Sequence, residues 1–328
     1  MNKIKIGMLS FAHMHAFSYF EVLIEREDAE IVGIWDADPS RVKDICDTHQ
    51  VTFFDRYEDL LETDCDVIII NSENVFHAEH TIAAAKAKKH VMCEKPLGTK
   101  VADMEAMIEA CKENGVKLMT AFPNRYVPTV VEAKRLIDQG EIGELVAVKG
   151  TNKGAMPGGW FVDASLSGGG AMLDHSVHVM DIMNWVIGSP AVEVYAENGT
   201  LFYDELNIDD SGMVNVKFAN GVIASLDTSW SRIEPYPYKR DLTIEWIGTK
   251  GTISIDYFQQ INEIYSGEIG HAEWSYWGDN KDDLLVSDLL HVLKTGEDMP
   301  ITGEDGLHST RVAIAAYESA RTGRVVKI

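Results

Sequence analysis

The stretch His90-Val91-Met92-Cys93-Glu94-Lys95-Pro96-Leu97 predicts both the fold class and the place of the chemistry. Its first four residues are typical of a short buried strand, and Lys95 follows the carboxyl end of that strand. In open parallel sheets, ligands bind at this edge. Because Pro96 lacks a backbone donor and restricts Lys95 to extended geometry, we expect the strand to end here with the ammonium group held in a fixed direction. A lysine beside a carboxylate at such an edge can clamp a phosphate, act as a general acid or base, or be a solvated surface charge.

Strands and helices alternate on both sides of this stretch. Strands are predicted at Ile4–Leu9, Ile31–Trp35, Val67–Ile70, His90–Cys93 and Val116–Ala121, and helices at Ala16–Arg26, Thr81–Lys89 and Val101–Glu113. The continuous apolar run Val67–Ile70 indicates a strand that is covered on both faces. This alternation predicts an α/β domain with a doubly wound parallel sheet over residues 1–122.

From residue 123 to residue 328 the pattern changes to alternating strands. Helices are predicted at Val130–Gln139, Ala171–Ile187, Asp282–Leu293 and Glu304–Arg321, and strands at Leu145–Lys149, Val192–Ala196, Gly212–Phe218, Val222–Ser229, Leu242–Gly248 and Thr252–Asp256. We expect a second α/β domain with a large, mostly antiparallel open sheet, one face of which meets solvent or a partner. The aromatic run Trp274, Tyr276 and Trp277, with His271 nearby, is open to substrate-loop, subunit-contact and packing interpretations.

Composition restricts the possible partners. The 328 residues carry a formal net charge of −23, and both halves of the chain are negative, so nucleic acid or an anionic membrane would be repelled. The chain starts directly into a strand pattern without a signal peptide, and no apolar run reaches the ~18 residues of a membrane span. Four cysteines without metal-like pair spacing predict free thiols in a reducing compartment, and hence a cytoplasmic location.

The first turn stands where a dinucleotide-binding fold has its glycine fingerprint. Ser10, Ala12 and His15 take the three glycine positions. Small residues at the first two still permit close approach of a pyrophosphate, and the helix N-terminus supplies the rest of an anion site. Asp36 ends the second strand, where an acidic side chain accepts from a ribose 2′-hydroxyl. Because that carboxylate repels a 2′-phosphate, and Ala37 rather than an arginine follows it, we expect NAD, with NADP less favoured.

A second constellation follows the glycines Gly168-Gly169-Gly170 on the predicted helix from Ala171. Asp174 and His178 are four residues apart, so they share one face of the helix. A carboxylate beside an imidazole fixes its tautomer and orientation, as a proton-transferring histidine requires. His175 is expected to point about 100° away from Asp174, given the helical geometry.

These motifs together resemble the glucose–fructose oxidoreductase, inositol 2-dehydrogenase and MocA (Gfo/Idh/MocA) family. The resemblance rests on segments in matching order along nearly the whole chain: Ser72-Glu73-Asn74 with His77, Cys93–Leu97, Asn124-Arg125-Tyr126, Gly168–Gly170 with Asp174 and His178, Gly248–Gly251 and Tyr317–Arg321. It implies an N-terminal Rossmann domain, a C-terminal domain whose open sheet forms a homodimer or homotetramer, and NAD(P)-dependent chemistry on a sugar-like or cyclitol substrate. In that family the Lys-Pro bond can be cis.

The resemblance also implies residue roles. Lys95, Asp174 and His178 match the family's catalytic lysine, aspartate and histidine. We expect cofactor contacts from Ser10, Phe11, Ala12, His13, Met14, Asp36, Asn71, Ser72, His77, Glu94, Lys95 and Arg125. We expect substrate contacts from Lys95, Trp160, Asp174, His175 and His178.

This chain departs from the family pattern at three places. The fingerprint glycines are replaced, which affects cofactor affinity or pose. His13 and His15 occupy a loop that normally carries small residues. His175 and Ser176 replace the usual residues between Asp174 and His178, so the substrate pocket is expected to differ from that of the sugar enzymes.

The leading hypothesis is hydride transfer between NAD(H) and a secondary alcohol of a sugar, polyol or cyclitol. His178 would handle the hydroxyl proton with support from Asp174, and Lys95 would bind the reacting oxygen, although the two roles can be exchanged. Two alternatives stay open. One is a metal-dependent hydrolase with His13, His15, His175 and His178 as ligands; the other is a non-catalytic NAD-binding regulator. The favoured hypothesis includes no metal.

Overall fold

The structure is a computed structural model that describes residues 3–233, 236–237, 241–257, 261–265, 272–276 and 278–328. The chain divides into two compact units, the first formed by Met1–Pro123 with Lys281–Leu307 and the second by Asn124–Asn280 with His308–Ile328. His271 and Trp277 of the aromatic run lie outside the described residues, and so do the side chains of Trp274 and Tyr276.

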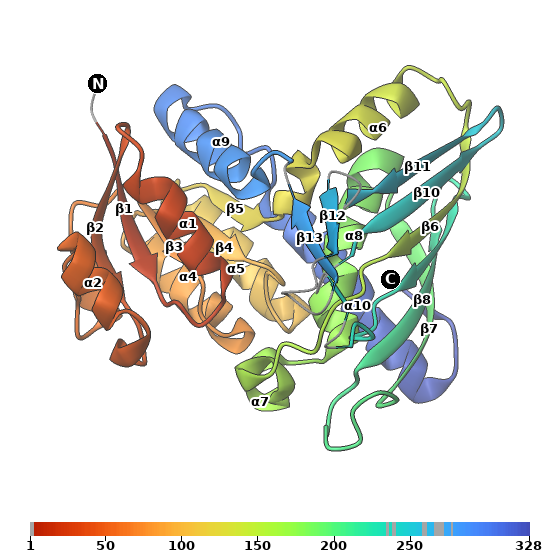
Figure 1. The fold of residues 1–328 in the computed structure, drawn as a ribbon. Coiled ribbons are helices and arrows are strands. Elements are labelled where there is room, and N and C mark those ends of the chain that lie inside the picture. Colours follow the sequence, from red (N-terminus) through yellow and green to blue (C-terminus); the bar gives the residue numbers. More distant parts are fainter. Residues whose placement is uncertain (1–2, 234–235, 238–240, 258–260, 266–271, 277) are drawn as a thin grey trace. The chain divides into compact units, whose positions relative to one another are not determined.

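The first unit is built on a five-stranded parallel sheet with the strand order β2-β1-β3-β4-β5 (Figure 1). Its strands are β1 (Ile4–Leu9), β2 (Ala29–Trp35), β3 (Val67–Ile70), β4 (His90–Glu94) and β5 (Leu118–Ala121). Its helices are α1 (His15–Ile24), α2 (Lys43–His49), α3 (Tyr57–Leu61), α4 (His77–Lys86), α5 (Val101–Asn114) and α9 (Lys281–Thr295), with the short turns η1 (Pro39–Arg41) and η2 (Asn74–Phe76). All four residues of β3 are buried, as a strand covered on both faces requires. The predicted doubly wound parallel sheet is confirmed.

Helix α9 belongs to the first unit, although the sequence-based division placed it in the second domain. It packs on α1, where the Ser18 hydroxyl donates to Asp282 Oδ2 at 2.7 Å and Arg26 Nη1 donates to Ser287 Oγ at 2.8 Å. Its apolar face, including Leu285 and Leu289, is buried. Helical periodicity shows that a helix has a buried face but does not show which core receives that face, and this is why the division was wrong for α9.

The second unit contains a seven-stranded sheet with the order β11-β10-β6-β9-β8-β7-β14, in which only β6 and β9 pair in parallel. Its strands are β6 (Leu145–Thr151), β7 (Ala191–Gly199), β8 (Ser211–Phe218), β9 (Ile223–Asp227), β10 (Thr243–Gly248), β11 (Thr252–Asp256) and β14 (Val326–Lys327), and the hairpin β12 (Ile261–Tyr265) with β13 (Ala272–Tyr276) pairs separately. Its helices are α6 (Pro128–Asp138), α7 (Ala164–Ser167), α8 (Ala171–Ile187) and most of α10 (Gly303–Thr322), with the turns η3 (Pro123–Tyr126) and η4 (Gly159–Val162). The predicted mostly antiparallel sheet is confirmed.

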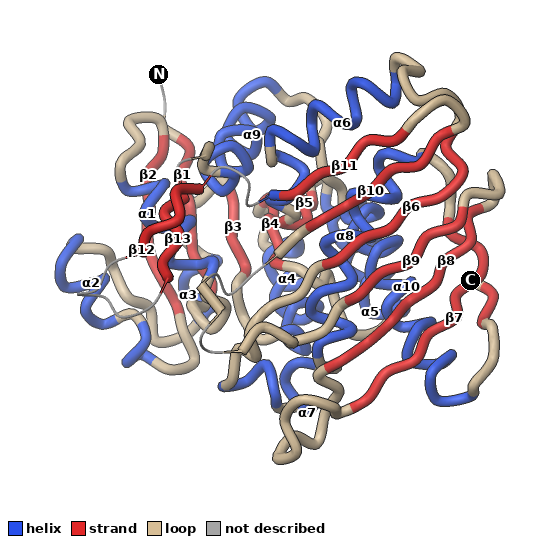
Figure 2. The backbone as a smooth tube through the Cα atoms, turned by 45° about the vertical axis from the view of Figure 1, so that its right-hand side comes forward, coloured by secondary structure: helices blue, strands red, loops and turns tan. Residues whose placement is uncertain are grey.

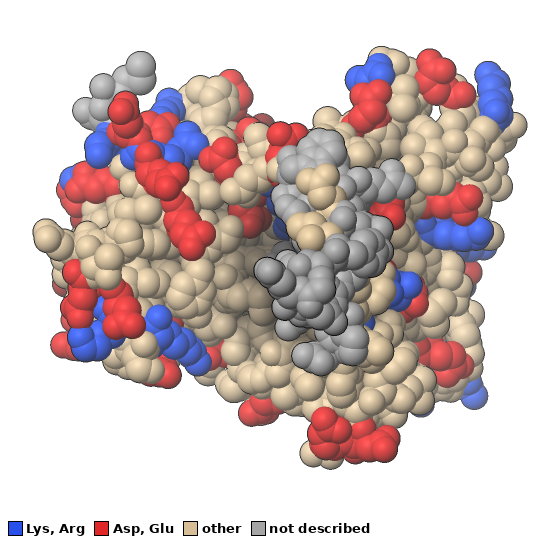
Figure 3. Space-filling view, in the orientation of Figure 1, with Lys and Arg blue, Asp and Glu red and all other residues tan. Residues whose placement is uncertain are grey.

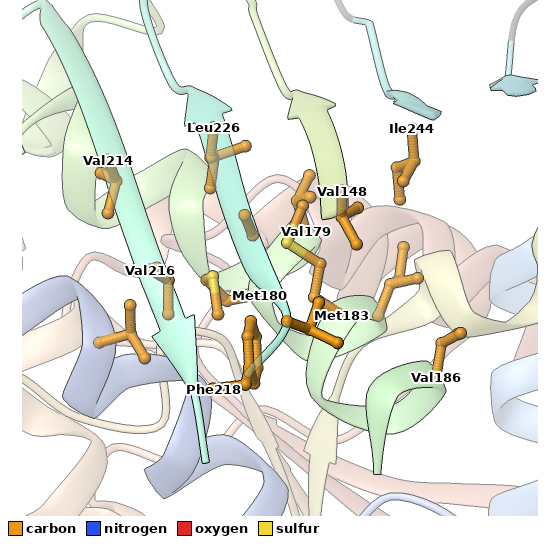
Figure 4. Packing of buried hydrophobic residues seen from close by; sticks show 14 of the residues in the cluster. Val148, Val179, Met180, Met183, Val186, Val214, Val216, Phe218, Leu226 and Ile244 are labelled. Carbon is orange, nitrogen blue, oxygen red and sulfur yellow. The ribbon is translucent and has the colours of Figure 1, made fainter. Parts of the chain in front are cut away.

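Helix α8 packs against one face of this sheet, and the apolar side chains between the two form the core of the second unit. Figure 4 shows Met180 and Met183 of α8 among Val214, Val216 and Phe218 of β8. Along β8, buried and exposed residues alternate strictly from residue 212 to residue 218, because successive side chains of a strand point to opposite faces. Each fully buried apolar side chain of this size stabilises the fold by about 1.5–3 kcal/mol.

The opposite face of the seven-stranded sheet is not covered by helices α8 and α10, which lie behind the strands in Figure 2. Val146, Met213 and Ile223 are each about half exposed on it. A shallow cavity of about 440 Å³ crosses β6, β7, β8 and β9 on this sheet. Figure 3 shows acidic side chains spread over the visible surface with basic ones among them. Among the residues that the structure describes, no helix is both long enough and apolar enough to cross a membrane.

Candidate active site

The turn after β1 keeps the backbone shape of a glycine fingerprint without its glycines. Ser10 has a φ of 72°, in the left-handed region that favours glycine,. Its hydroxyl oxygen accepts from the Ala12 N–H at 3.1 Å and its hydroxyl donates to Asp36 Oδ2 at 3.1 Å. The His13 N–H donates to the Asn71 carbonyl at 2.9 Å. Local hydrogen bonds therefore hold Ser10 in a backbone conformation whose strain energy is of order 1 kcal/mol. Helix α1 begins directly after this turn.

Phe11 and Met14 take different places in this turn. The ring of Phe11 is buried and meets the rings of Phe17 and Phe20 edge-on, at centroid distances of 5.3 Å and 6.1 Å. Met14 is half exposed. The side chain of Phe11 therefore packs the turn onto α1, and the predicted cofactor contacts of Phe11 and Met14 stay predictions.

Asp36 is fully engaged by the protein itself. Its side chain is 0% exposed. Oδ2 accepts from the Phe11 N–H at 2.5 Å and from the Ser10 hydroxyl, and Oδ1 accepts from the Asp38 N–H at 2.7 Å and from Arg41 Nη1 at 3.2 Å. A carboxylate has about four lone-pair sites, so all of them are used by these donors.

Arg41 brings a guanidinium to the site that the sequence argument did not anticipate. Ala37, and not an arginine, directly follows Asp36 in the sequence. The 3-10 turn η1 folds Arg41 back, so that its guanidinium bridges Asp36 and Glu73, with Nη2 at 3.2 Å from Glu73 Oε1. The side chain of Arg41 is 30% exposed. The sequence signal was the short Asp-Pro turn, which reverses the chain direction.

A cavity of about 210 Å³ lies at the carboxyl ends of β2 and β3. It is lined by Ser10, Trp35, Ala37, Tyr57, Ser72, Glu73, Phe76, Glu79 and His80. The rings of Trp35, Tyr57 and His80 meet edge-on at centroid distances of 5.1–5.6 Å. Aromatic walls beside a strand end suit a planar base such as adenine. Sequence reasoning missed these three aromatic residues because they come from three separate segments of the chain.

His80 in this cavity is held neutral. Burial, and then the charge of His77, lower the pKa of His80 to about 4. Its Nδ1 lies 2.9 Å from the Ser72 hydroxyl oxygen. The imidazole thus serves as an uncharged wall at neutral pH, and Ser72 is engaged by it.

Asn71 provides an independent sign that this edge receives a polar ligand. It follows β3 directly and is 0% exposed. Among the described residues, neither its amide oxygen nor its amide nitrogen has a hydrogen-bond partner. Leaving such groups unpaired costs about 1–3 kcal/mol each, and a bound polar ligand would recover it. The residues present therefore fit a nicotinamide dinucleotide.

Lys95 lies buried on the turn after β4, and the Lys95–Pro96 peptide bond is cis, as the family resemblance implied. The neighbouring Glu94 carboxylate accepts from the Lys95 N–H at 3.1 Å and from the Tyr19 hydroxyl at 2.6 Å. Burial and the Glu94 charge raise the pKa of Tyr19 well above its ordinary value, so Tyr19 stays a donor. Burial also raises the pKa of the Cys93 thiol, which keeps it unreactive,.

The imidazole of His77 contacts the backbone of this turn and of the segment after β3. It is fully buried, with Nδ1 at 2.8 Å from the Pro96 carbonyl oxygen and Nε2 at 3.0 Å from the Ser72 carbonyl oxygen. Burial lowers its pKa. His77 thus connects the exit of β3 to the segment that carries Lys95, and its predicted cofactor contact stays a prediction.

His13 and His15 gather with Glu94 in a group whose nitrogen and oxygen atoms lie within 4.8 Å of one another, a composition that suits zinc,. His15 Nδ1 lies 3.1 Å from Glu94 Oε1 and His13 Nε2 lies 3.9 Å from Glu94 Oε2. However, His13 Nδ1 accepts from the His15 N–H at 3.2 Å. A neutral imidazole has one lone pair for bonding, so this places the hydrogen on Nε2, and a protonated Nε2 cannot act as a metal ligand.

In the second unit, Gly170 begins α8 at a point with no room for a side chain. A Cβ there would lie 2.0 Å from the backbone oxygen of Asp209. The Asp209 carboxylate accepts from the N–H groups of Gly170 and Met172 at 3.1 Å and 2.8 Å, and from the Tyr317 hydroxyl at 2.7 Å. This cap fixes the start of the helix that carries Asp174 and His178.

Asp174 and His175 lie side by side on the first turn of α8. His175 Nε2 is 3.4 Å from Asp174 Oδ2 and its Nδ1 is 3.2 Å from the Thr228 carbonyl oxygen, while Trp230 Nε1 donates to Asp174 at 3.3 Å. The prediction that His175 points away from Asp174 was wrong, because the side chain turns back to reach Thr228. The pairing of Asp174 with His178 stays a prediction.

The remaining predicted residues of the second unit are buried or stacked. His178 is 8% exposed on α8. Arg125 donates from Nε and Nη2 to the Asp181 carboxylate at 2.7 Å and 2.6 Å, a buried bidentate pair. Trp160 stacks on Phe161 with 3.9 Å between ring centroids. A cofactor contact of Arg125 and a substrate contact of Trp160 stay predictions.

Comparison with known proteins defines the class. Residues 5–122 match the model of an oxidoreductase family with an NAD-binding Rossmann fold, and residues 130–254 match the Gfo/Idh/MocA C-terminal domain. An oxidoreductase from Bacillus subtilis, the uncharacterized YrbE, is 30% identical over 310 residues that cover 91% of this chain and 89% of that protein. The chain belongs to the Gfo/Idh/MocA family of NAD(P)-dependent oxidoreductases. The hydrolase alternative is therefore wrong.

Other relatives cover almost the full length. A myo-inositol 2-dehydrogenase of Thermotoga maritima is 28% identical over 334 residues, which cover 98% of this chain and 97% of that enzyme. The crystal structure of an aldose-aldose oxidoreductase from Caulobacter crescentus, complexed with glycerol, superposes with a TM-score of 0.85 at 26% identity and covers 100% of both chains. A complex of GenD2, from gentamicin A biosynthesis, with NAD has a TM-score of 0.91 at 23% identity, which shows the shared fold.

Proposed function

We propose that this enzyme transfers a hydride between NAD(H) and a secondary alcohol of a sugar, polyol or cyclitol. The observation that carries the proposal is the buried Lys95, held beside Glu94 on the turn after β4 of the NAD-binding domain. An ammonium group in that position can stabilise the negative charge that develops on a reacting hydroxyl oxygen. The names of relatives that act on myo-inositol and on aldoses support this class of substrate.

Each proposed residue has one task. Lys95 binds the reacting oxygen of the substrate, His178 takes or returns the hydroxyl proton, and Asp174 stabilises the charged imidazole. Asp174 is also in contact with His175 Nε2 at 3.4 Å, so a second imidazole stands beside the proposed proton-handling pair. When bound, the nicotinamide supplies the hydride acceptor or donor. A positioned acid or base contributes about 10²–10⁴-fold to the rate.

We propose NAD rather than NADP as the cofactor. The aromatic cavity at the ends of β2 and β3 would hold the adenine, the N-terminus of α1 would hold the pyrophosphate, and the unpaired amide of Asn71 would contact the ligand,. Among the described residues, Glu73 and Glu79 line the cavity and Asp36 lies beside it, and the guanidinium of Arg41 balances only part of their negative charge. That surplus of negative charge disfavours a 2′-phosphate.

Lys95→Ala tests the proposal, with Lys100→Ala on the same segment as the control because Lys100 is exposed. Turnover is followed at 340 nm with NAD and a panel of inositols, aldoses and linear polyols, and NAD binding is followed by calorimetry. We expect Lys95→Ala to lose at least 10²-fold in kcat while it still binds NAD. Lys100→Ala should keep wild-type turnover. Equal turnover of Lys95→Ala and wild type would remove Lys95 from the mechanism.

The same experiment decides between an enzyme and a non-catalytic regulator. A regulator would bind NAD but turn over no member of the panel, in the wild type as in the variant. In that case the proposed reaction is wrong, while the NAD-binding assignment of the fold is kept.

We also propose that two or four copies of the chain associate through the open face of the seven-stranded sheet. The half-exposed apolar residues Val146, Met213 and Ile223 on this face support the proposal,. Ile223→Lys should lower the mass measured by light scattering toward that of the monomer, with Ile233→Lys, an exposed residue outside the sheet, as control.

The four cysteines are free and buried, and a cytoplasmic location stays a prediction.

A further inference from the structure

Two carboxylates, those of Asp36 and Glu73, lie near the proposed binding site for the adenosine ribose of a dinucleotide. They differ in whether their oxygens can still accept a hydrogen bond from a ligand. Asp36 has a fully buried side chain, and four donors of the protein occupy its oxygens. Glu73 lines the 210 Å³ cavity, and among the residues that the structure describes its side chain meets one donor, Arg41, which contacts Oε1. Glu73 therefore keeps acceptor capacity on the side of the cavity, and Asp36 does not.

The donors on Asp36 show what its charge does. It joins Ser10 and Phe11 of the turn after β1 to Asp38 and Arg41 of the turn after β2. Because Ser10 is held in a left-handed conformation, the turn needs such an anchor where glycines are lacking. In this chain the aspartate has become part of the loop architecture.

Arg41 links the two carboxylates, and its guanidinium could bind a phosphate group if it were released from them. Its guanidinium donates to Asp36 Oδ1 and to Glu73 Oε1, both at 3.2 Å. A guanidinium pairs with phosphate in a bidentate manner, and this one is 30% exposed. Glu73 holds it and cancels its charge.

We propose that Glu73, held by Arg41, is the carboxylate that reads the adenosine ribose and rejects a 2′-phosphate, while Asp36 organises the cofactor loop. This inference rests on the proposed use of a nicotinamide dinucleotide and adds the residues that choose between its two forms. Removal of the Glu73 charge both lowers the repulsion and frees Arg41. The preference should then move toward the phosphorylated cofactor.

The test compares the affinities for ADP-ribose and 2′-phospho-ADP-ribose by calorimetry, so that no hydride transfer is needed. In Glu73→Gln we expect the preference for ADP-ribose to fall at least tenfold. In the double variant Glu73→Gln/Arg41→Ala the affinity for the 2′-phosphorylated probe should fall again, at least fivefold, because the freed guanidinium is gone.

Glu79→Gln is the matched control. Glu79 lines the same cavity, but its carboxylate accepts from the Tyr57 hydroxyl at 3.1 Å. Its substitution removes one negative charge and leaves Arg41 held, so we expect the preference to change by less than threefold. Asp36→Asn should likewise change the preference by less than threefold, and should lower the melting temperature because the loop loses its anchor.

Three results would overturn the inference: an unchanged preference in Glu73→Gln, an equal change in Glu79→Gln, or a larger change in Asp36→Asn than in Glu73→Gln. If the wild-type protein binds ADP-ribose and NAD normally in these cases, the proposed function is kept and only the role of Glu73 fails. If the wild type binds neither probe nor NAD, the proposed function fails with it.

Discussion

The turn after β1 and the glycines before α8 solve similar problems in opposite ways. At Ser10 the backbone has the left-handed conformation that favours glycine, yet the chain carries a serine there. At Gly170 the φ of −92° is open to any residue, yet only glycine fits, because a Cβ would meet the backbone of Asp209 at 2.0 Å. A conformational need can be met by side-chain hydrogen bonds, whereas a lack of space cannot.

This difference explains how a family member can lose the glycine fingerprint and keep the other glycines. The hydroxyl of Ser10 connects Ala12 to Asp36, and these bonds repay the strain of the turn. The steric limit at Gly170 has no such remedy, since backbone atoms on both sides are fixed by the cap on α8.

Gly170→Ala should have the largest effect of the substitutions that test this comparison. We expect a loss of more than about 3 kcal/mol in the free energy of unfolding, because two backbone segments must separate. Gly251→Ala is the control: its added Cβ would meet the Ile142 side chain at 3.5 Å, an ordinary van der Waals distance. Urea unfolding measures both, and an equal loss in the two variants would contradict the steric argument.

Asp209→Ala should come next. It leaves the N–H groups of Gly170 and Met172 and the Tyr317 hydroxyl without their acceptor. We expect a loss of about 2–3 kcal/mol in the free energy of unfolding. Helix α8 should also exchange its first amide hydrogens faster, and unchanged exchange at residues 170–174 would show that Asp209 does not cap the helix.

The first unit should show the clearer response to pH, through His80. The unfolded chain takes up a proton near pH 6.5, whereas the folded protein does so only near pH 4. Stability is therefore full above about pH 6.5 and falls as the pH drops toward 4, by about 2 kcal/mol between pH 6.5 and pH 5. His80→Gln should flatten the unfolding free energy over that interval. A wild-type slope in the variant would show that His80 is not the group responsible.

The smallest effects are expected at Ser10. Ser10→Ala keeps the left-handed strain and loses both hydrogen bonds, so we expect a loss of about 1 kcal/mol. Ser10→Gly loses the same bonds but relieves the strain, and should stay within about 0.5 kcal/mol of the wild type. Thermal unfolding of the pair measures the difference, and equal stabilities would mean that the turn is not strained.

Much of the fold could be read from the pattern of residues. The apolar run Val67–Ile70 and the helix Ala171–Ile187 have the bounds that were predicted, because burial on both faces and helical periodicity are local properties. The catalytic candidates also came from local motifs. The aromatic cavity did not, because Trp35, Tyr57, Phe76 and His80 meet only after the parallel sheet has formed.

By itself, the sequence determined the succession of most strands and helices along the chain, the family, and the lysine and histidine that are proposed to act. Only the tertiary structure decided that Arg41 folds back onto Asp36 and Glu73, that His175 turns toward Asp174, and that α9 packs with the first unit. The physical reason is range: backbone preferences and periodicity act over a few neighbouring residues, whereas ion pairs and packing join groups that the sequence keeps far apart.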